Sequence, residues 1–368
     1  MEKTIFFIVL VFVFNACGGV EYTVFNDFSH ASLKKVPWSS LKGFKDDNLA
    51  RTFQAFKLAC TKTNDVSYLK QSCNNTTNYI NAKKFFKDNF TPYAMYNDFN
   101  KNKGLITGYY EPLLHGSLEQ TQTYKYPIYK TPKDLITVNL SSIYPDLSNY
   151  QLRGRLVGTT LVPFYSRANL QDEKDLKAIC FVKSRINRFF LEVQGSGKIL
   201  LENGKTISVS YANQNGQKYV SIGKKLIDMG AIKKKDVSLQ SIKKYLKKHP
   251  KQVNEVLNSN KSVIFFKQND GEALGALGVP LKAGVNIAVD KRYVPLGVPV
   301  FLSTTNPINK KIKINLLTIA ADVGGAIKGR IRADFFFGSG KEAASLAGVM
   351  NESGSMFILV PNSIAKSF

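Results

Sequence analysis

The 368-residue chain carries 51 lysine and arginine residues against 27 aspartate and glutamate residues, a formal net charge of +24. Its 44% hydrophobic residues exclude global disorder and can fill the core of two ordinary domains, or of one domain with a large insertion. The charge predicts an anionic partner, for which nucleic acid, an acidic membrane and an anionic polymer all qualify. A solvated lysine-rich surface is the alternative.

The first seventeen residues predict export. A lysine at position 3 precedes an apolar run from Ile5 to Phe14, and a small residue then stands before Cys17. This pattern is typical of a secretory signal, and the run is too short to span a bilayer as a stable helix. A cysteine after a small residue resembles the lipobox of bacterial lipoproteins, although Phe14 replaces the usual aliphatic residue. Residues 1–17 are interpreted as a signal peptide with Cys17 as its lipidation site; a plain signal peptide is the alternative.

Export permits disulfides, and three cysteines remain beyond Cys17. Cys60 and Cys73 are close enough in sequence to bridge a helix to the loop after it, which would leave Cys180 as a buried free thiol. Spacing alone does not fix this pairing. The three histidines stand far apart, and no two cysteines have the spacing of zinc ligands. Neither a metal site nor a cofactor is expected.

Helices are the first elements that the sequence predicts, between Pro37 and about residue 90. Leu49, Phe53, Phe56 and Cys60 recur at steps of three or four and form one apolar face. A second helical run follows over residues 79–90. The aromatic side chains of both runs are expected to pack into a core.

From Gly104 onwards, β-branched and aromatic residues alternate with glycine, proline and asparagine turns, which predicts a β region. Ser238 is expected to cap a helix over 240–248, and a short helix over 252–257 follows. Good helix formers predict another helix over 341–350. Strands are expected at 105–110, 156–164, 188–193, 207–211, 262–267, 285–289, 298–302, 314–320 and 356–360.

Three aspartates near the C-terminus stand in apolar or glycine-rich surroundings: Asp290, Asp322 and Asp334. A carboxyl group at the end of a strand can face a cleft while its back lies against a core. Such partial burial, or a second carboxylate nearby, raises its pKa and produces the protonated acid that glycosidic cleavage requires. For each aspartate taken alone, a cap that binds backbone amides is the favoured interpretation.

Short motifs in a fixed order connect these aspartates to a known family. The motifs are 107–112 (TGYYEP), 126–129 (YPIY), 193–197 (VQGSG), 219–223 (YVSIG), 321–329 (ADVGGAIKG), 332–334 (RAD) and 338–340 (GSG). Together they resemble the membrane-bound lytic transglycosylase A (MltA) family, from about Trp38 to Pro361.

The resemblance implies a mainly β fold with flanking helices. Its members have a double-psi β-barrel into which a second, smaller β domain is inserted, and the glycan lies in the groove between the two. In this chain the barrel is expected to comprise 18–103 and 251–368, and the inserted domain 104–250. The order of elements predicted from the residues themselves, which is helices, a β region, helices and a second β region, agrees with this arrangement.

The resemblance also assigns roles to residues. Asp334 stands at the position of the single catalytic acid and base, and Asp322 matches the aspartate that supports it. Glu111 is expected at a rim or turn, and Asp290 is expected to be structural. The substrate-binding candidates are Thr107, Tyr109, Tyr110, Gln194, Gly195, Ser196, Gly324 and Lys328. The two tyrosines could stack on sugar rings or pack into the core.

The implied activity is cleavage of the bond between N-acetylmuramic acid and N-acetylglucosamine in peptidoglycan, with formation of a 1,6-anhydro ring. A muramidase-type hydrolase and a non-catalytic peptidoglycan-binding protein are the alternatives. The expected partners are glycan strands and, through a lipid anchor, a membrane. Nucleic acid is not expected, because the chain is exported and has no aromatic–basic RNA-binding motif. The family implies a monomer in the periplasm at the outer membrane.

Overall fold

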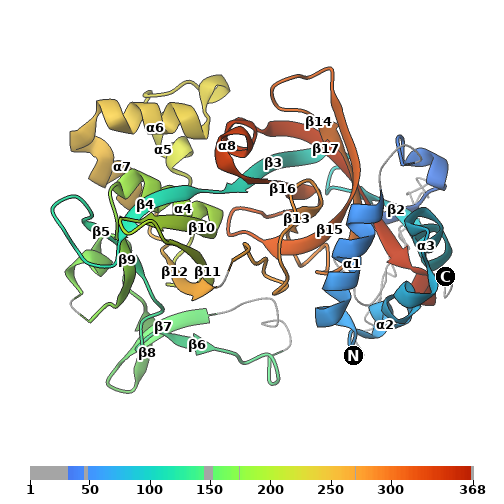
Figure 1. Ribbon diagram of the computed structural model, residues 1–368, viewed down its shortest axis with the longest axis horizontal. Helices are drawn as coiled ribbons and strands as arrows, with labels where there is room; N and C mark the ends of the chain where they lie inside the picture. The colour runs from blue at the N-terminus through green and yellow to red at the C-terminus, as the bar shows by residue number, and fades with distance from the viewer. Residues whose placement is uncertain (1–31, 45–48, 145–151, 174, 270, 366–368) are drawn as a thin grey trace, which may run out of the picture.

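The computed structural model describes residues 32–44, 49–144, 152–173, 175–269 and 271–365, so the expected signal peptide and Cys17 lie outside the described residues. Figure 1 shows two lobes side by side, connected by a long strand that passes from one lobe into the other. The right-hand part in that view, residues 32–111 and 271–365, is termed the barrel lobe. Residues 112–269 on the left are termed the insert lobe.

Helices cover the outer side of the barrel lobe. They are α1 (Leu49–Thr63), α2 (Ser67–Asn74) and α3 (Ala82–Asn89). The predicted apolar face of α1 is confirmed, because Phe53 and Phe56 are buried against Phe85 and Phe86 of α3. The ring centroids of these pairs lie between 4.6 and 6.1 Å apart, within the range of favourable aromatic contacts.

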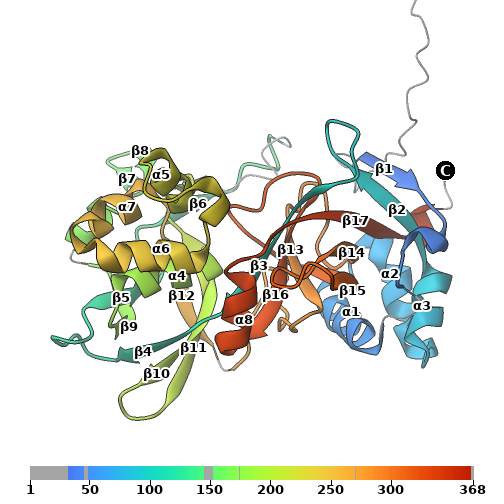
Figure 2. The same cartoon turned by 90° about the horizontal axis from the view of Figure 1, so that it is seen from above.

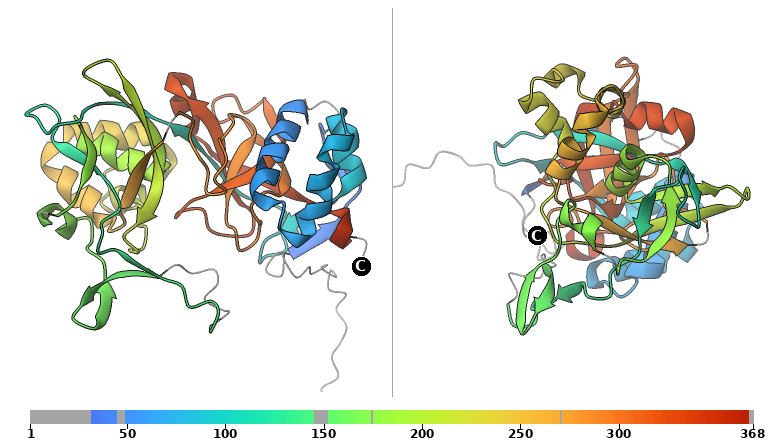
Figure 3. Two further views of the ribbon diagram at one scale, coloured as in Figure 1. Left: turned by 60° about the horizontal axis from the view of Figure 1, so that its bottom comes forward. Right: turned by 90° about the vertical axis from the view of Figure 1, so that its left-hand side faces the viewer.

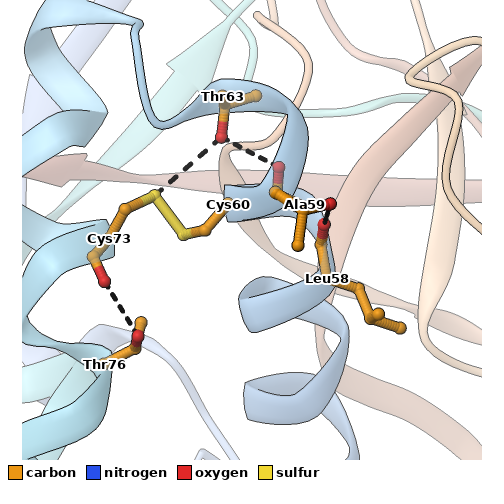
Figure 4. Close-up of a disulfide and its surroundings, with 7 residues drawn as sticks. Leu58, Ala59, Cys60, Thr63, Cys73 and Thr76 are labelled. Atoms are coloured by element: carbon orange, nitrogen blue, oxygen red, sulfur yellow. Dashed lines mark hydrogen bonds between the residues drawn. A yellow bond between two sulfur atoms is a disulfide. The ribbon is translucent and has the colours of Figure 1, made fainter.

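A disulfide between Cys60 and Cys73 ties α1 to α2, as Figure 4 shows. Next to it, the Thr63 hydroxyl donates a hydrogen bond of 3.1 Å to the Ala59 carbonyl. The structure thus joins the two cysteines whose pairing the spacing left open, and Cys180 is free and buried. Cys73 stands on a helix where the sequence had suggested a loop.

Six strands close into a barrel: β3 (Gly104–Glu111), β13 (Asn286–Val289), β14 (Pro299–Thr305), β15 (Lys313–Val323), β16 (Arg332–Ser339) and β17 (Asn351–Pro361). They pair in the order β17-β14-β15-β13-β16-β3, and β3 pairs back onto β17. The pairs β13–β15 and β16–β3 are parallel, whereas the other four are antiparallel. This closed, mixed barrel confirms the mainly β fold that the sequence predicted. On the outer side of β17, the sheet continues into β2 (Phe90–Tyr96) and β1 (Ser32–Lys35).

The insert lobe contains one six-stranded sheet and one three-stranded sheet. The larger sheet has the order β12-β11-β10-β4-β9-β5, with β4 (Leu113–Ser117), β5 (Tyr126–Tyr129), β9 (Ala178–Val182), β10 (Ser196–Leu201), β11 (Thr206–Gln214) and β12 (Ile264–Asn269). The smaller sheet contains β6 (Ile136–Val138), β7 (Leu152–Val157) and β8 (Thr160–Pro163). It projects from the lobe in Figure 1 and in both views of Figure 3.

Helices of the insert lobe pack beside the larger sheet: α4 (Arg185–Gln194), α5 (Ile222–Asp228), α6 (Leu239–Lys248) and α7 (Val253–Ser259). The predicted cap of α6 is confirmed, because the Ser238 side chain accepts from the Ser241 amide at 3.0 Å. The Ser241 hydroxyl reciprocates by accepting from the Ser238 amide at 2.9 Å, which completes a capping box.

The prediction of a strand over residues 188–193 is wrong, because these residues belong to helix α4. Ser184 caps this helix by accepting from the Asn187 amide, and Gly195 ends it with a φ of 80°. The buried residues Ile186, Phe189 and Phe190 follow the helical period, which the β-rich neighbourhood concealed.

The predicted strand at 156–164 is a hairpin of β7 and β8, which turns at Gly158 with a φ of 59°. Strand β16, which carries Asp334, was not predicted. Its first residues alternate between partly buried and buried positions, and Arg332 and Asp334 interrupt the apolar pattern that indicates a strand.

The pairing of the strands gives the inserted domain other bounds than the expected 104–250. Strand β3 belongs to the barrel, because it pairs with β16 and β17. Strand β12 belongs to the insert sheet, because it pairs with β11. Sequence alone placed both boundaries at changes of composition, whereas hydrogen bonds to distant strands determine where each strand belongs.

Helix α8 (Gly340–Ala347) lies at the boundary between the lobes, as Figure 2 shows. Gly108 allows the close approach of α8 to β3, since a Cβ atom there would stand 3.0 Å from the Ala347 Cα atom of the helix. At the end of α8, the Gly348 carbonyl accepts a hydrogen bond of 3.0 Å from the Leu239 amide at the start of α6. The two lobes therefore contact each other through backbone as well as through the crossing strand.

Removing the disulfide is expected to destabilise the barrel lobe. The double substitution Cys60→Ala and Cys73→Ala opens a crosslink over a sequence separation of 13 residues. We expect a loss of about 3 kcal/mol in unfolding free energy, measured by urea denaturation. Dithiothreitol should lower the stability of the wild-type chain and leave that of the double variant unchanged. Equal stability of both proteins without reductant would contradict the prediction.

Candidate active site

Two aspartates and a threonine stand at one level of the barrel, on three different strands. Asp334 of β16 is paired with Thr107 of β3 on one side and with Ala288 of β13 on the other. Ala288 is in turn paired with Asp322 of β15. Paired residues on neighbouring strands point to the same face of a sheet, so these side chains share one face.

That face is turned away from the main core of the barrel. Ile287 and Val289, the neighbours of Ala288 along β13, are fully buried in the main core cluster. Ala288 instead belongs to a smaller cluster with Tyr109 and Phe336. The alternation along β13 therefore places the two carboxyl groups over this smaller cluster, on a wall of the barrel that is only partly covered.

Asp334 is partly buried and receives one strong hydrogen bond. The Thr107 hydroxyl donates to its Oδ1 atom at 2.7 Å. Burial raises the pKa of Asp334 above its usual value, although the Thr107 hydrogen bond and the positive charge of Arg332 oppose this rise. The carboxyl group is held in a fixed orientation and keeps its proton more readily than an aspartate in water.

Asp322 is also partly buried, and the backbone holds it. Its Oδ1 atom accepts hydrogen bonds of 2.9 Å from the amides of Ala276 and Val323. Burial raises the pKa of Asp322 to about 6 despite these hydrogen bonds, and the negative charge of Asp334 raises it further. The two aspartates are electrostatically coupled, which disfavours simultaneous ionisation.

Tyr109 and Tyr110 are both buried, so neither ring presents a face on which a sugar could stack. Tyr109 packs against Phe336 with ring centroids 5.0 Å apart, and its hydroxyl is enclosed beside the two aspartates. Burial, with the negative charges of Asp322 and Asp334, raises its pKa well above the usual value. Tyr110 packs beneath α8. The structure favours the core-packing alternative for both rings.

The turn 194–196 connects the insert lobe to strand β3. The Gln194 Oε1 atom accepts a hydrogen bond of 2.9 Å from the Tyr110 amide, and Gly195 takes the left-handed conformation that ends α4. Ser196 is buried at the start of β10. Gln194 therefore fixes the position of the strand that carries Thr107, a role that the sequence did not suggest.

The loop after Asp322 is fastened at its far end by Asp290. Asp290 is almost fully buried, forms an ion pair of 2.6 Å with Arg292 and accepts a hydrogen bond from the Gly329 amide. Burial alone would raise its pKa, but these partners lower the pKa below the usual value. Asp290 is thus placed as a structural carboxylate. Within the loop, Gly324 is partly buried and Lys328 is exposed.

Glu111, expected at a rim, is instead buried where β3 leaves the barrel. Its Oε2 atom lies 3.7 Å from the Lys198 ammonium group of the insert lobe, and burial raises its pKa. Its burial and this contact with Lys198 place Glu111 between the lobes and away from the outer surface.

Tyr219 belongs to the motif at 219–223, for which the sequence indicated no role in the site. The structure brings this insert-lobe side chain close enough to Asp334 for the negative charge of that carboxyl group to raise the tyrosine pKa, after burial as the main cause. The proximity depends on contacts between the two lobes. The only signal in the sequence was the motif itself.

In the described parts of the chain, no three histidine, cysteine, aspartate or glutamate side chains are grouped so that they could hold a metal ion. Over the same ranges, no helix combines the length and the apolar character that crossing a bilayer requires.

The fold and the site together define a barrel protein with two electrostatically coupled aspartates at the border of an inserted β domain. Residues 105–267 match the sequence profile of the MltA specific insert domain, and residues 285–360 match the 3D domain. The chain belongs to the MltA family.

Relatives and solved structures agree with this assignment. Membrane-bound lytic murein transglycosylase A of Escherichia coli (strain K12) is 33% identical over 262 residues, which cover 69% of this chain and 65% of that protein. The chain thus matches just under two thirds of that relative. The crystal structure of MltA from Neisseria gonorrhoeae is 32% identical, with a TM-score of 0.76, over 90% of this chain and 93% of that one.

Two further solved structures extend the likeness. A membrane-bound lytic murein transglycosylase from Agrobacterium tumefaciens has a TM-score of 0.82 at 27% identity, over 91% of this chain and 99% of that one. E. coli MltA with bound chitohexaose has a TM-score of 0.67 at 26% identity, over 85% of this chain and 90% of that one. The expected two-domain fold with a barrel is therefore confirmed.

Removing the charge of Asp322 is expected to stabilise the protein at neutral pH. The pKa of Asp322 is about 6 when folded and 3.8 without the fold, so ionisation costs stability as pH rises through this interval and costs nothing below it. Asp322→Asn keeps an Oδ1 acceptor for both amides. We expect it to gain roughly 1–3 kcal/mol at pH 7.5, measured by thermal unfolding, and to lose this gain near pH 4.

Asp290→Asn is the matched control, because the pKa of Asp290 is lowered in the fold. Its charge stabilises the fold above its unfolded pKa and ceases to do so as pH falls. This variant should therefore be less stable than wild type at pH 7.5. A destabilised Asp322→Asn at that pH would contradict the prediction.

Proposed function

We propose that the chain is a lytic transglycosylase that cleaves the β-1,4 bond between N-acetylmuramic acid and N-acetylglucosamine in peptidoglycan. The observation that carries the proposal is the Asp334 carboxyl group, oriented by Thr107 and with a raised pKa, at the border of the two lobes. The similar E. coli structure holds chitohexaose, which supports a glycan as the substrate of this chain. A cleft between two domains suits a polymer.

In the first step, protonated Asp334 donates its proton to the oxygen that links the two sugars. The bond between this oxygen and the anomeric carbon of the muramic acid breaks, and the N-acetylglucosamine leaves with a hydroxyl group. The acetamido oxygen of the same muramic acid bonds to the anomeric carbon as the glycosidic bond breaks, and the acetamido group takes up the positive charge. The raised pKa of Asp334 favours this step, because the group must carry its proton beforehand.

In the second step, the ionised Asp334 acts as the base. It removes the proton from the C6 hydroxyl of the muramic acid, and that oxygen bonds to the anomeric carbon while the acetamido oxygen leaves it. The product is a 1,6-anhydro ring, and Asp334 regains its proton. Attack within one sugar has a high effective concentration, which favours this route over attack by water.

Asp322 supports the acid without being required to react. The negative charge of Asp334 raises the pKa of Asp322, so the pair disfavours the state in which both carboxyl groups are ionised. A second carboxyl group near the acid is also what an ordinary muramidase uses to activate water. That hydrolase is the alternative function, and its products would end in reducing muramic acid in place of anhydro rings.

Asp334→Asn is expected to abolish the release of anhydromuropeptides from purified sacculi, with a loss of about 10²–10⁴-fold or more. The amide retains an acceptor for Thr107 but cannot supply a proton. Mass spectrometry of the soluble products gives both the rate and the type of end. Asp88→Asn, on the outer surface of α3, is the control and should match wild type. Reducing ends from wild type would indicate the muramidase, and near-normal release by Asp334→Asn would exclude Asp334 as the acid.

We further propose a place in the cell envelope. The similar relatives are named membrane-bound, and the signal at 1–17 with lipidation at Cys17 would attach this chain to the inner face of the outer membrane as a monomer. The net charge of +24 would then hold the enzyme to the carboxylates of peptidoglycan stem peptides by screened attraction.

Binding of the Asp334→Asn protein to sacculi is expected to weaken as salt rises from about 0.05 M to about 0.5 M, because the range of the attraction shortens. A sedimentation assay measures the bound fraction. Sacculi with amidated stem carboxylates are the control, and their weaker binding should depend little on salt. A bound fraction that does not change with salt would contradict the electrostatic explanation.

A further inference from the structure

Tyr219 lies in the loop between β11 and α5 and faces the barrel lobe. A Cβ atom on Gly325, in the loop after Asp322, would stand 3.8 Å from the Tyr219 Cβ atom. The side chain is partly buried, and its hydroxyl has no hydrogen-bond partner among the residues that the structure describes. Tyr219 therefore brings an uncommitted hydroxyl group from the insert lobe to the edge of the aspartate site.

The backbone on both sides of Tyr219 is held by buried side chains. On one side, the Asn215 side chain donates to the carbonyls of Tyr165 and Lys261 at 2.8 and 2.9 Å. On the other side, the Val220 amide donates to the Asn260 side chain at 3.1 Å. Asn215 and Asn260 are almost fully buried, so the loop has little freedom to move.

Arg167 holds the same loop from behind. Its guanidinium group is buried, forms an ion pair of 2.6 Å with Glu192 and donates to the Asn260 carbonyl at 3.0 Å. The fold thus satisfies Arg167 internally and uses it to fix the asparagine that binds next to Tyr219. Several buried polar groups form hydrogen bonds that hold this short loop, whereas the Tyr219 hydroxyl forms none with the described residues.

Electrostatics keep this hydroxyl protonated. Burial raises the pKa of Tyr219 above its usual value; the positive charge of Arg167 lowers it and the negative charge of Asp334 raises it. At neutral pH the phenol is therefore a hydrogen-bond donor. It lies within electrostatic reach of the carboxyl group proposed as the acid.

We propose that Tyr219 is a substrate-positioning residue, which the insert lobe contributes to the Asp334 site by donating a hydrogen bond to an oxygen atom of the bound sugar. The inference rests on the proposed function and goes beyond the two aspartates. The acceptor is a sugar hydroxyl or the carbonyl of an acetamido group, which share this chemistry. A pre-positioned donor costs little entropy on binding and aligns the sugar with the acid.

The test is Tyr219→Phe, which removes only the hydroxyl. With soluble glycan fragments of peptidoglycan, we expect KM to rise about tenfold and kcat to stay within about twofold of wild type. The melting temperature should not change, because the hydroxyl has no partner within the described protein. Tyr211→Phe, on the exposed surface of β11, is the matched control and should have wild-type KM and kcat.

Each outcome decides the inference. An unchanged KM overturns it, and so does a lower kcat at unchanged KM, with or without a lower melting temperature, since that pattern fits a structural role. Fragments that are N-deacetylated only at their glucosamine residues keep the muramic acetamido group that the reaction uses. If the rise in KM disappears on them, the acceptor is the acetamido carbonyl of a glucosamine; if it persists, the acceptor is a hydroxyl or the muramic acetamido carbonyl. Wild type is assayed in parallel, so a failure of the proposed function is seen as an absence of anhydro products in wild type itself.

Discussion

The pairing of β3 with β16 is the interaction on which the rest of the site depends. It closes the barrel, and at one position in its register it places the Thr107 hydroxyl 2.7 Å from Asp334. The same strand then leaves the barrel at Glu111 and enters the insert lobe as β4. Strand β3 therefore completes the ring and orients the Asp334 side chain, and the chain then continues as β4 into the insert sheet. Gln194 and α8 also contact β3, so residues far from the aspartates help to hold this strand in place.

The site is a compromise between stability and chemistry. Two coupled carboxyl groups beside an enclosed tyrosine hydroxyl are an unfavourable arrangement at neutral pH, because each ionised group must lose part of its hydration. The backbone amides of Ala276 and Val323 offset part of this cost at Asp322, and Thr107 does so at Asp334. The apolar core around Ile287 and Ile319 lies on the other face of the same strands. Its burial stabilises the barrel and offsets the remaining desolvation cost of the two carboxyl groups.

Local patterns made part of this structure predictable from the sequence. The apolar face of α1, the Ser238 cap and the two aspartates were visible because each depends on neighbours within a few residues. Helix α4 was missed, since its surroundings suggested strands, and β16 was missed because Asp334 interrupts its pattern. The membership of β3 and the place of Tyr219 depend on partners more than a hundred residues away, and the membership of β12 depends on its pairing with β11. No pattern of neighbouring residues contains that information. The family resemblance predicted the order of the domains along the chain but not the contacts between their residues.

The two partners of the Thr107–Asp334 hydrogen bond are separated by 227 positions along the chain. Every residue of the insert lobe must emerge from the ribosome, and on the proposed route cross the inner membrane, before Asp334 can reach Thr107. Folding of the barrel is therefore a late event of high contact order, which slows it. A nascent or truncated chain lacks the oriented acid altogether. The topology therefore prevents the Asp334 site from assembling until the whole insert lobe has been synthesised.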